Sequence, residues 1–448
     1  MISPTVHKSD FRARGLAKSL GDAALPLANP GDLDPLIDAI GEARYVLLGE
    51  ASHGTSEFYT WRTELSKRLI VEKQFSFIGV EGDWPDCYRV NRFVKGYQNS
   101  GASAAEVLHA FDRWPTWMWA NREIVALAEW LHEHNRALPD EQKTGFYGLD
   151  VYSLWESMAA VVDYLEGVDP EFARMARNAY DCFEPFNEDV QEYARATALV
   201  PMSCQDETVR VLRELRSRAP EFSEDGREAY FNAEQNAIVT RGAELYYRTM
   251  VRGGPTSWNV RDHHMVDTLD RLMRHHGDRA KATVWEHNTH VGDARFTDMA
   301  RAGMVNVGQL VRQSHESEGV VLAGFATHHG TVIAGREWGA PMRRMEVPNA
   351  RVGSVEDLAH LGTDGRDALF VFDGSDDGGI EGLDAPLDNR AIGVVYDPRA
   401  ERYGNYVPTI VPRRYDALLF IDETRAVDPL HMPVRVSADE PETYPTGM

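Results

Sequence analysis

The feature that most constrains the fold is a series of short apolar runs, several of which end in an ionisable residue. The first three are YVLLGE, FSFIGVE and FYGLD, which end at Glu50, Glu81 and Asp150. ATVWEHN, VVLAGF, ALFVFD, AIGVVY and ALLFID follow later in the chain. Amphipathic stretches separate the early runs, and this strand–helix–strand order is typical of parallel sheets. We therefore predict an α/β protein with a mostly parallel central sheet flanked by helices.

The region from about residue 153 to residue 276 has a different pattern. Long charged amphipathic segments such as DETVRVLRELRSR replace the short apolar runs. Apolar residues spaced three and four apart are typical of helices that cover a core with one face. We predict a largely helical subdomain over 153–276, inserted within a single α/β domain that spans residues 1–448.

Charge and hydropathy narrow the classes of partner. The 448 residues include 47 Lys and Arg against 70 Asp and Glu, which gives a formal net charge of −23 at pH 7. Because no long run of Lys or Arg interrupts this acidic background, we expect no binding to nucleic acid or to anionic membranes. No segment approaches the ~20 apolar residues of a transmembrane helix, and the first residues contain no apolar signal-peptide core.

The number and spacing of the cysteines bear on the compartment of the protein. Cys87, Cys182 and Cys204 are too few and too widely spaced to predict a disulfide framework or a metal knuckle, which suits a reducing compartment. We expect a cytoplasmic protein that acts on a small molecule. The sequence leaves its oligomeric state open.

The ionisable residues at the ends of the predicted strands indicate a functional crevice. Open α/β sheets bind ligands outside the carboxyl ends of their strands. Glu50, Glu81 and Asp150 lie at such ends, and WEHNTH adds His287 and His290. Buried charges are costly unless they are paired, so the alternative is a set of internal salt bridges and caps. For Asp150 taken alone we favour that structural interpretation.

The segment GEASHGTSEF is the centre of the predicted site. Gly49 allows the backbone to turn at the strand end, and His53 then lies just before a predicted helix. The helix dipole lowers the pKa of a histidine at that position and favours the neutral imidazole that a general base needs. Glu50, three residues earlier, is placed to orient the ring.

The role of Arg62 is undecided by spacing. It follows His53 by nine residues, which is two and a half helical turns and would place it near the opposite side of a regular helix. It can pair with Glu50 or Glu81, or bind an oxyanion. A surface salt bridge is an equal competitor.

His287 and His290 also suit a metal by residue type, together with Glu50, His53 and Glu81. However, the sequence contains no H-E-x-x-H helix, so we predict no bound metal and no other cofactor. It also contains no G-x-S-x-G elbow, Walker A segment or G-x-G-x-x-G, which disfavours a serine esterase or a nucleotide enzyme.

The stretch RWPTWMWANRE brings three tryptophans close together in the chain. Trp117 and Trp119 are candidates to line an apolar substrate pocket. Tryptophans more often belong to the core, and that interpretation is favoured here.

Successive blocks of the chain resemble one known family. GEASHGTSEFYTWR, FIGVEGDWPD, WMWANRE, WNVRD, WEHNTH, GVVYDPRAERYGNY and DALLFIDETRAVDPL resemble, in the same order, blocks of the erythromycin esterase family, from about residue 40 to residue 430. The resemblance implies an α/β core with a helical portion and a deep cleft. It also implies hydrolysis of the macrolactone ester of macrolide antibiotics, without metal and without a covalent serine intermediate.

The resemblance also implies roles for individual residues. His53 would remove a proton from water, Glu81 would help to hold that water, and His287 with Arg62 or His290 would stabilise the oxyanion. The expected catalytic set is Glu50, His53, Arg62, Glu81, His287 and His290, and the expected substrate-binding set is Trp117, Trp119, Asp150 and Glu286.

Glu286 is a departure, since family members often carry a small residue there. A carboxylate close to His287 would raise the pKa of that histidine and alter substrate preference. Two alternatives remain: a metal-dependent hydrolase that uses the same cluster, and a non-catalytic biosynthetic or binding protein on the same scaffold.

Overall fold

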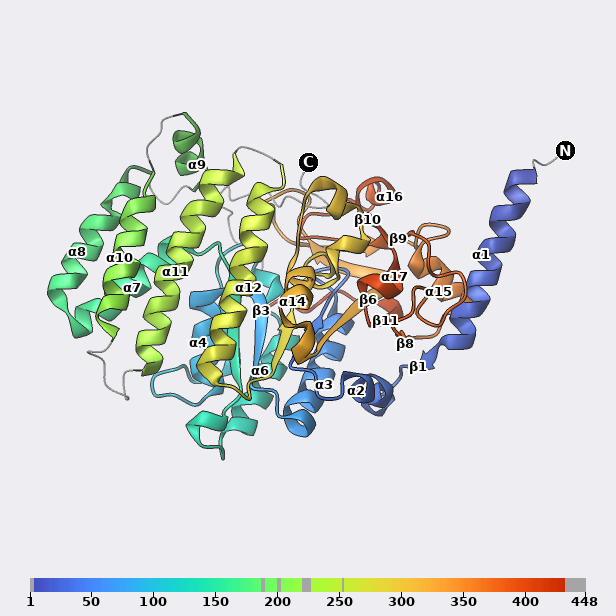
Figure 1. The fold of residues 1–448 in the computed structure, drawn as a ribbon, viewed down its shortest axis with the longest axis horizontal. Coiled ribbons are helices and arrows are strands. Elements are labelled where there is room, and N and C mark those ends of the chain that lie inside the picture. The colour runs from blue at the N-terminus through green and yellow to red at the C-terminus, as the bar shows by residue number, and fades with distance from the viewer. Residues whose placement is uncertain (1–3, 187–189, 200–202, 220–226, 252–253, 432–448) are drawn as a thin grey trace.

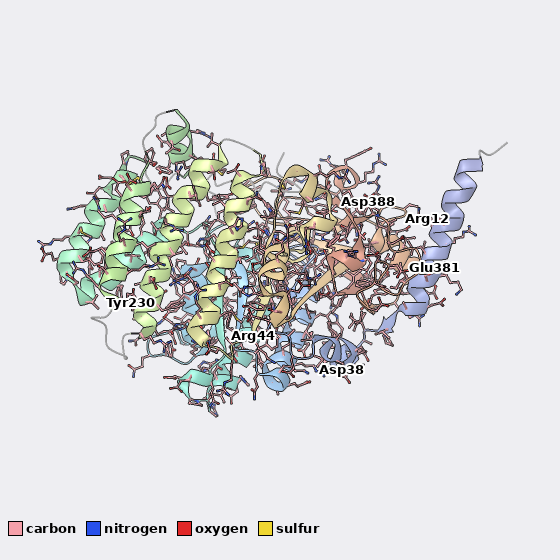
Figure 2. The ribbon with its side chains drawn as sticks, in the orientation of Figure 1. Arg12, Asp38, Arg44, Tyr230, Glu381 and Asp388 are labelled. Carbon is pink, nitrogen blue, oxygen red and sulfur yellow. A yellow bond between two sulfur atoms is a disulfide. The ribbon has the colours of Figure 1, made fainter. Side chains whose placement is uncertain are left out.

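The structure is a computed structural model, and it describes residues 4–186, 190–199, 203–219, 227–251 and 254–431. Figure 1 shows a central sheet with a group of helices at one end of the molecule and the N-terminal helix at the other. Charged residues such as Arg12, Asp38 and Glu381 lie exposed on the outside (Figure 2).

Within the described residues the main sheet has nine strands in the order β1–β8–β11–β6–β2–β5–β3–β4, with β7 added to β6. All neighbours from β11 to β4 in this order are parallel, and β1, β8 and β7 pair antiparallel. The strands of the main sheet are β1 Leu25–Pro26, β2 Tyr45–Leu48, β3 Phe77–Asp83, β4 Gly145–Asp150, β5 Ala282–Trp285, β6 Val320–Ala334, β7 Arg343–Val347, β8 Ala368–Val371 and β11 Ala417–Thr424. The predicted α/β class with a mostly parallel sheet is confirmed.

Both faces of this sheet are buried. Along β2, Val46 and Leu48 pack on one face with Leu65 of α3, whereas Leu47 packs on the other face with Leu269 of α12. Apolar residues at every position of β2 follow from this double burial, because side chains alternate between faces. The helices outside the long helical region are α1 Pro4–Ala23, α2 Asp34–Ile40, α3 Ser56–Lys73, α4 Trp84–Val94, α5 Ala104–His109, α6 Arg122–Asn135, α13 Asn288–Val291, α14 Val307–His315, α15 Val355–Thr363, α16 Glu401–Gly404 and α17 Val411–Arg414.

The chain between β4 and β5 is helical where it is described, as predicted. Its helices are α7 Leu154–Val168, α8 Pro170–Tyr180, α9 Val190–Leu199, α10 Gln205–Ser217, α11 Arg227–Met250 and α12 Thr256–His276. They enclose a hydrophobic cluster of their own, which includes Leu165, Val211 and Ala237. Helix α12 also packs against β4, so this region adjoins the strand ends. Its independence as a subdomain stays a prediction.

One predicted strand is absent, and one small sheet was not predicted. The run AIGVVY, residues 391–396, forms no strand and makes only isolated bridges, because it is a buried loop in which Val394 lines a cavity. A small second sheet, β9 Leu387–Arg390 with β10 Tyr406–Thr409, was not predicted.

The expectation from the cysteines is also wrong. Cys182 and Cys204 form a disulfide in the helical region, so cysteine usage no longer argues for a reducing compartment. Helix packing, which spacing does not reveal, brings these two cysteines together.

Cys87 is free and buried. Among the described helices, none is both long enough and apolar enough to cross a membrane.

The loop after β2 approaches β6 closely at Gly54. The Gly54 carbonyl accepts hydrogen bonds from the amides of Ile333 and Val427 at 3.1 and 3.0 Å. A Cβ at Gly54 would lie 2.1 Å from the carbonyl oxygen of Ile333, which is backbone and cannot swing aside.

We expect Gly54→Ala to lower the free energy of unfolding by about 1–3 kcal/mol, because the loop must move away from β6. Urea unfolding would measure this. Gly167→Ala is the matched control: Gly167 lies in α7, and a Cβ added there would have no atom within 4 Å, so stability should be unchanged or slightly higher. Equal stability of both variants would contradict the close approach.

Candidate active site

The predicted strand-end residues are brought to one edge of the sheet. Strands β2, β5, β3 and β4 are neighbours, and parallel pairing aligns their carboxyl ends. Glu50 and His53 follow β2, Glu81 lies near the end of β3, and Asp150 ends β4. Parallel topology thus joins residues that are far apart in the sequence.

His53 lies between two carboxylates, and one of them holds its ring. Its Nδ1 lies 2.9 Å from Glu50 Oε1, and its Nε2 lies 3.9 Å from Glu81 Oε1. The ring is 1% exposed, and the residue lines the cavity. His53 precedes Thr55, the N-cap residue of α3. Because an ionised carboxylate only accepts, Nδ1 donates to Glu50 and the neutral ring carries its lone pair on Nε2.

Arg62 pairs with Glu50 and is not on the surface. Its Nη2 donates to Glu50 Oε2 at 2.7 Å, and the side chain is fully buried. The guanidinium stacks against Tyr59 and Trp285, with its Cζ 4.6 and 4.7 Å from the ring centroids. Arg62 does not line the cavity, so it acts on His53 through Glu50.

Arg261 of α12 connects three of the predicted residues and was not singled out from the sequence. Its Nε and Nη2 donate to the two carboxylate oxygens of Asp150 at 2.9 and 2.7 Å, and Nη2 also donates to Glu81 at 2.7 Å. Its Nη1 lies 3.0 Å from Nε2 of His290. The only sequence signal for Arg261 is the block WNVRD.

Glu81 is ionised in this environment. Burial by itself raises the pKa of Glu81, but the protonated forms of His290 and His53, followed by the permanent charge of Arg261, outweigh burial and hold the pKa well below its ordinary value. The backbone amide of His287 donates to Glu81 Oε2 at 2.8 Å and adds to this effect.

His290 does not line the cavity, although its Nε2 lies 3.4 Å from Glu81 Oε1. Its Nδ1 lies 2.9 Å from Asp262, and its ring stacks on Trp258 with centroids 4.4 Å apart. With Nε2 turned to Arg261, His290 supports the guanidinium. Asp262 was another residue that sequence reasoning missed.

His287 lies beside His53, with ring centroids 4.8 Å apart. The amide of Thr289 donates to its Nδ1, so we assign the proton of the neutral ring to Nε2. Burial, followed by the nearby His53, lowers the pKa of His287 well below its ordinary value. Nε2 is buried and has no hydrogen-bond partner among the described residues, and His287 is not one of the residues that line the cavity.

Glu286 does not behave as expected. It is fully buried, neither carboxylate oxygen has a hydrogen-bond partner in the described structure, and it does not line the cavity. Burial first, and then Glu81 and Asp262, raise the pKa of Glu286 well above its ordinary value. The pKa of His287 is lowered and not raised, and Glu286 is not among the groups that shift it, so the expected effect of Glu286 on His287 is not found.

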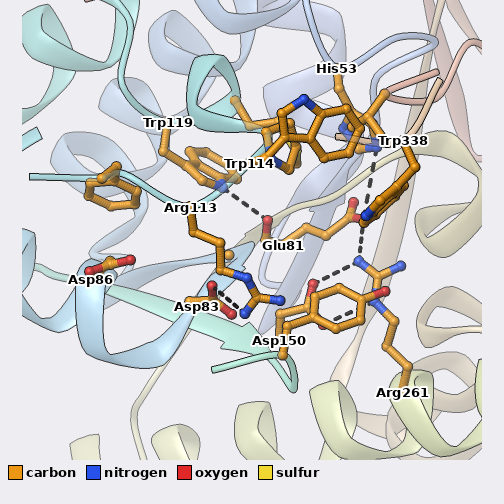
Figure 3. Close-up of a pocket in the computed structure, with 16 residues that line it drawn as sticks. His53, Glu81, Asp83, Asp86, Arg113, Trp114, Trp119, Asp150, Arg261 and Trp338 are labelled. Carbon is orange, nitrogen blue, oxygen red and sulfur yellow. Dashed lines mark hydrogen bonds and ion pairs between the residues drawn. The ribbon is translucent and has the colours of Figure 1, made fainter. Parts of the chain in front are cut away.

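A cavity opens beside His53, with aromatic side chains on one side and charged groups on the other (Figure 3). Its volume is about 80 Å³. The residues that line it include His53, Glu81, Asp83, Asp86, Phe111, Arg113, Trp114, Trp119, Asp150, Tyr152, Arg261, Trp338 and Val394. Trp119 thus reaches the cavity and donates from Nε1 to the Glu81 carbonyl at 3.0 Å, whereas Trp117 is fully buried in the core and does not line it.

Two further carboxyl groups at the cavity titrate near neutrality. Burial raises the pKa of Asp83 to about 8, although Arg113 lowers it from 3.2 Å away. Burial likewise raises the pKa of Asp86 to about 6, against the effect of Arg89. Sequence reasoning identified neither residue.

The Glu–His cluster does not match a metal site in the described part of the chain. Where three ligand atoms come close enough for one ion, they belong to another group of residues. At the cavity, a guanidinium already supplies positive charge to Glu81 and Asp150.

Comparison with known proteins gives the family. The family model described as "Erythromycin esterase" matches residues 70–424. The chain belongs to the erythromycin esterase family. Glu81, Arg261, His287 and His290 lie within the matched stretch, whereas Glu50 and His53 precede it.

The individual relatives are distant. Erythromycin esterase type II of Escherichia coli is 26% identical over 160 residues, which cover 35% of this chain and 36% of that protein, about a third of each. Among solved structures, a succinoglycan biosynthesis protein has a TM-score of 0.74 at 23% identity and covers 95% of this chain and 99% of its own.

Two more solved structures share the fold. A Bacillus cereus protein has a TM-score of 0.75 at 18% identity, with 94% and 99% of the two chains covered. An erythromycin esterase mutant in its open conformation has a TM-score of 0.63 at 16% identity, with 91% and 97% covered.

Glu286 gives a prediction for stability against pH. Because folding raises the pKa of Glu286, the folded protein keeps a proton that the unfolded chain releases above the ordinary pKa of 4.5. The free energy of unfolding therefore falls as pH rises, by up to about 1.4 kcal/mol per pH unit. Glu286→Gln removes this proton linkage.

We expect Glu286→Gln to gain stability relative to wild type between pH 5 and pH 8. Urea unfolding at several pH values would measure the difference. Glu129→Gln, at an exposed position of α6, should show no such trend. A parallel pH dependence of wild type and Glu286→Gln would mean that Glu286 is ionised in the folded protein.

Proposed function

We propose that this protein hydrolyses a carboxylic ester with a water molecule activated by His53, without a metal. The observation that carries the proposal is the chain Arg62–Glu50–His53, with contacts of 2.7 and 2.9 Å. It fixes the ring and leaves the lone pair on Nε2, on the side of Glu81. A base needs this arrangement to take a proton from water at neutral pH.

The attacking water is held between His53 and Glu81. The 3.9 Å between His53 Nε2 and Glu81 Oε1 is too long for a direct hydrogen bond, and a water molecule near both atoms can donate to each. His53 takes one proton as the water oxygen attacks the ester carbonyl. It then returns this proton to the leaving alkoxide, so the base is regenerated.

We assign oxyanion stabilisation to two groups: Arg261, which lines the cavity, and His287, which lies behind its wall next to His53. Arg261 lines the cavity and carries a positive charge held by Asp150 and Glu81. His287 offers the Nε2 proton, which has no acceptor among the described residues. Preorganised donors of this kind contribute ~10²–10³-fold in rate each.

The substrate we propose is a macrolide, on the basis of family membership and of the Escherichia coli relative's name. The cavity of about 80 Å³ is smaller than the ~300–1,000 Å³ of typical small-molecule sites. The ester-bearing edge of the ring therefore enters, against the aromatic wall of Trp114, Trp119 and Trp338, and the rest of the macrolide lies outside.

Removal of the base tests the chemistry. We expect His53→Ala to lower kcat for a hydrolysed macrolide by about 10²–10⁴-fold, because attack by water loses its proton acceptor. Product formation would be followed as the mass gain of one water. His134→Ala, on α6 and remote from the cavity, is the control and should keep wild-type turnover. Near-normal turnover by His53→Ala would overturn the general-base assignment.

Treatment with a chelator distinguishes the proposed metal-independent hydrolysis from the metal-dependent alternative. We expect the turnover of a macrolide panel by wild type to survive prolonged treatment with a chelator, since Arg261 supplies the cation at the site. Loss of turnover that returns with added metal would favour a metal-dependent hydrolase. No turnover of any macrolide would move the substrate to another ester or favour a non-catalytic role.

A further inference from the structure

A second cluster of ligand side chains lies outside the cavity. One possible ligand atom each from His328, His329 and Asp422 lie within 4.8 Å of one another. No other trio of His, Cys, Asp or Glu in the described ranges meets this distance. None of the three lines the cavity at His53.

Strand register brings His328 and Asp422 together. β6 and β11 run parallel, with Thr327 opposite Ile421 and His329 opposite Glu423. Asp422 is therefore level with His328, on the same face of the sheet, because side chains at the same level share a face. Helix α15 packs on these two strands and brings His360 to them.

His360 orients the carboxylate. Its Nδ1 lies 2.6 Å from Asp422 Oδ1, and its ring stacks on that of His328 with centroids 3.9 Å apart and planes 9° apart. A histidine that holds a ligand carboxylate in this way is a common feature of metal sites. Within the described structure, His360 is the only ion-pair partner of Asp422.

The spacing of the two histidines fits one small ion. His328 Nδ1 and His329 Nδ1 share a hydrogen bond at 3.2 Å, and a bound ion would replace the proton between them. Two nitrogens bound to a tetrahedral zinc ion at ~2.0–2.1 Å are about 3.3 Å apart. The ring planes differ by 80°, so the two rings approach from different directions.

The backbone around His329 is fixed. Its carbonyl accepts hydrogen bonds from the hydroxyls of Thr327 and Thr424 at 3.1 and 3.3 Å. The next residue, Gly330, has a φ of +144°, and a Cβ there would lie 2.0 Å from the Thr424 carbonyl oxygen. The chain therefore places His329 against β11 without depending on a ligand.

We propose that His328, His329 and Asp422 bind one divalent transition-metal ion of the zinc class, with His360 as the positioning residue for Asp422. Two imidazoles and one carboxylate suit zinc, whereas calcium and magnesium prefer sites built from oxygen. His328 and Asp422 are buried, and the partly exposed His329 leaves a route for the ion from solvent. The ion ties β6 to β11 and is separate from ester hydrolysis.

Calorimetric titration of chelator-treated protein with Zn²⁺ tests the site. We expect one tightly bound ion per chain in wild type, and binding weakened at least about tenfold in His328→Ala and in His329→Ala. His360→Ala should weaken binding by about 10–100-fold through the released carboxylate. Co²⁺ should give visible absorption bands of tetrahedral coordination in wild type, and these bands should be lost in His329→Ala.

The control is His134→Ala, which removes a partly exposed histidine from α6 and should bind Zn²⁺ like wild type. Because His329 is the most exposed of the three ligands, His329→Ala is the variant most certain to fold, and far-ultraviolet circular dichroism would verify this. Wild-type Zn²⁺ affinity in a folded His329→Ala protein would overturn the proposal. So would an equal loss of affinity in His134→Ala.

Discussion

The site depends on one buried guanidinium. Arg261 lies among Asp150, Glu81 and His290 with contacts of 2.7–3.0 Å, and without it two carboxylates would share a buried space. Loss of one partner from a buried ion pair costs about 3–5 kcal/mol, because the other charge is left uncompensated. Arg261 comes from α12, at the end of the helical region, whereas the carboxylates come from the sheet. The helical region therefore does more than cover the sheet, since it supplies a permanent cation that, together with His290 and His53, keeps Glu81 ionised.

Burial and neighbouring charges shift the pKa values of two nearby carboxyl groups, Glu81 and Glu286, in opposite directions. Glu81 has cationic partners and a backbone donor, which lower its pKa, whereas Glu286 has no hydrogen-bond partner among the described residues and its pKa is raised. The negative charge of Glu81 contributes to the raised pKa of Glu286, after burial. Environments that drive two pKa values apart are typical of acid–base sites. In this protein the separation leaves a negative charge on Glu81 beside His53, where we propose that the water binds, and it favours the neutral form of Glu286.

Much of the fold and part of the site could be predicted from local patterns. Apolar runs that end in Glu50, Glu81 and Asp150 give both the strands and their convergence, since parallel topology places strand ends at one edge. Arg261 could not be found in this way, because its place is set by the packing of α12 and no periodicity marks it. The same limit applies to the pairing of cysteines across the helical region. The strand predicted at 391–396 was wrong for the opposite reason, because this loop is buried and therefore has the apolar composition of a strand.

The two ligand clusters differ in how positive charge is provided. At the cavity, Glu81 and Asp150 share Arg261, so the space where a metal would bind already has a fixed cation. On strands β6 and β11, Asp422 has only His360 as an ion-pair partner in the described structure, because Arg390 pairs with Glu401 and donates to the His328 carbonyl. The Asp422 carboxylate therefore has no permanently charged partner among the described residues, and a bound ion would supply one. A metal found in the purified protein would therefore be assigned first to the cluster of His328, His329 and Asp422, and its presence alone would not bear on the proposed ester hydrolysis.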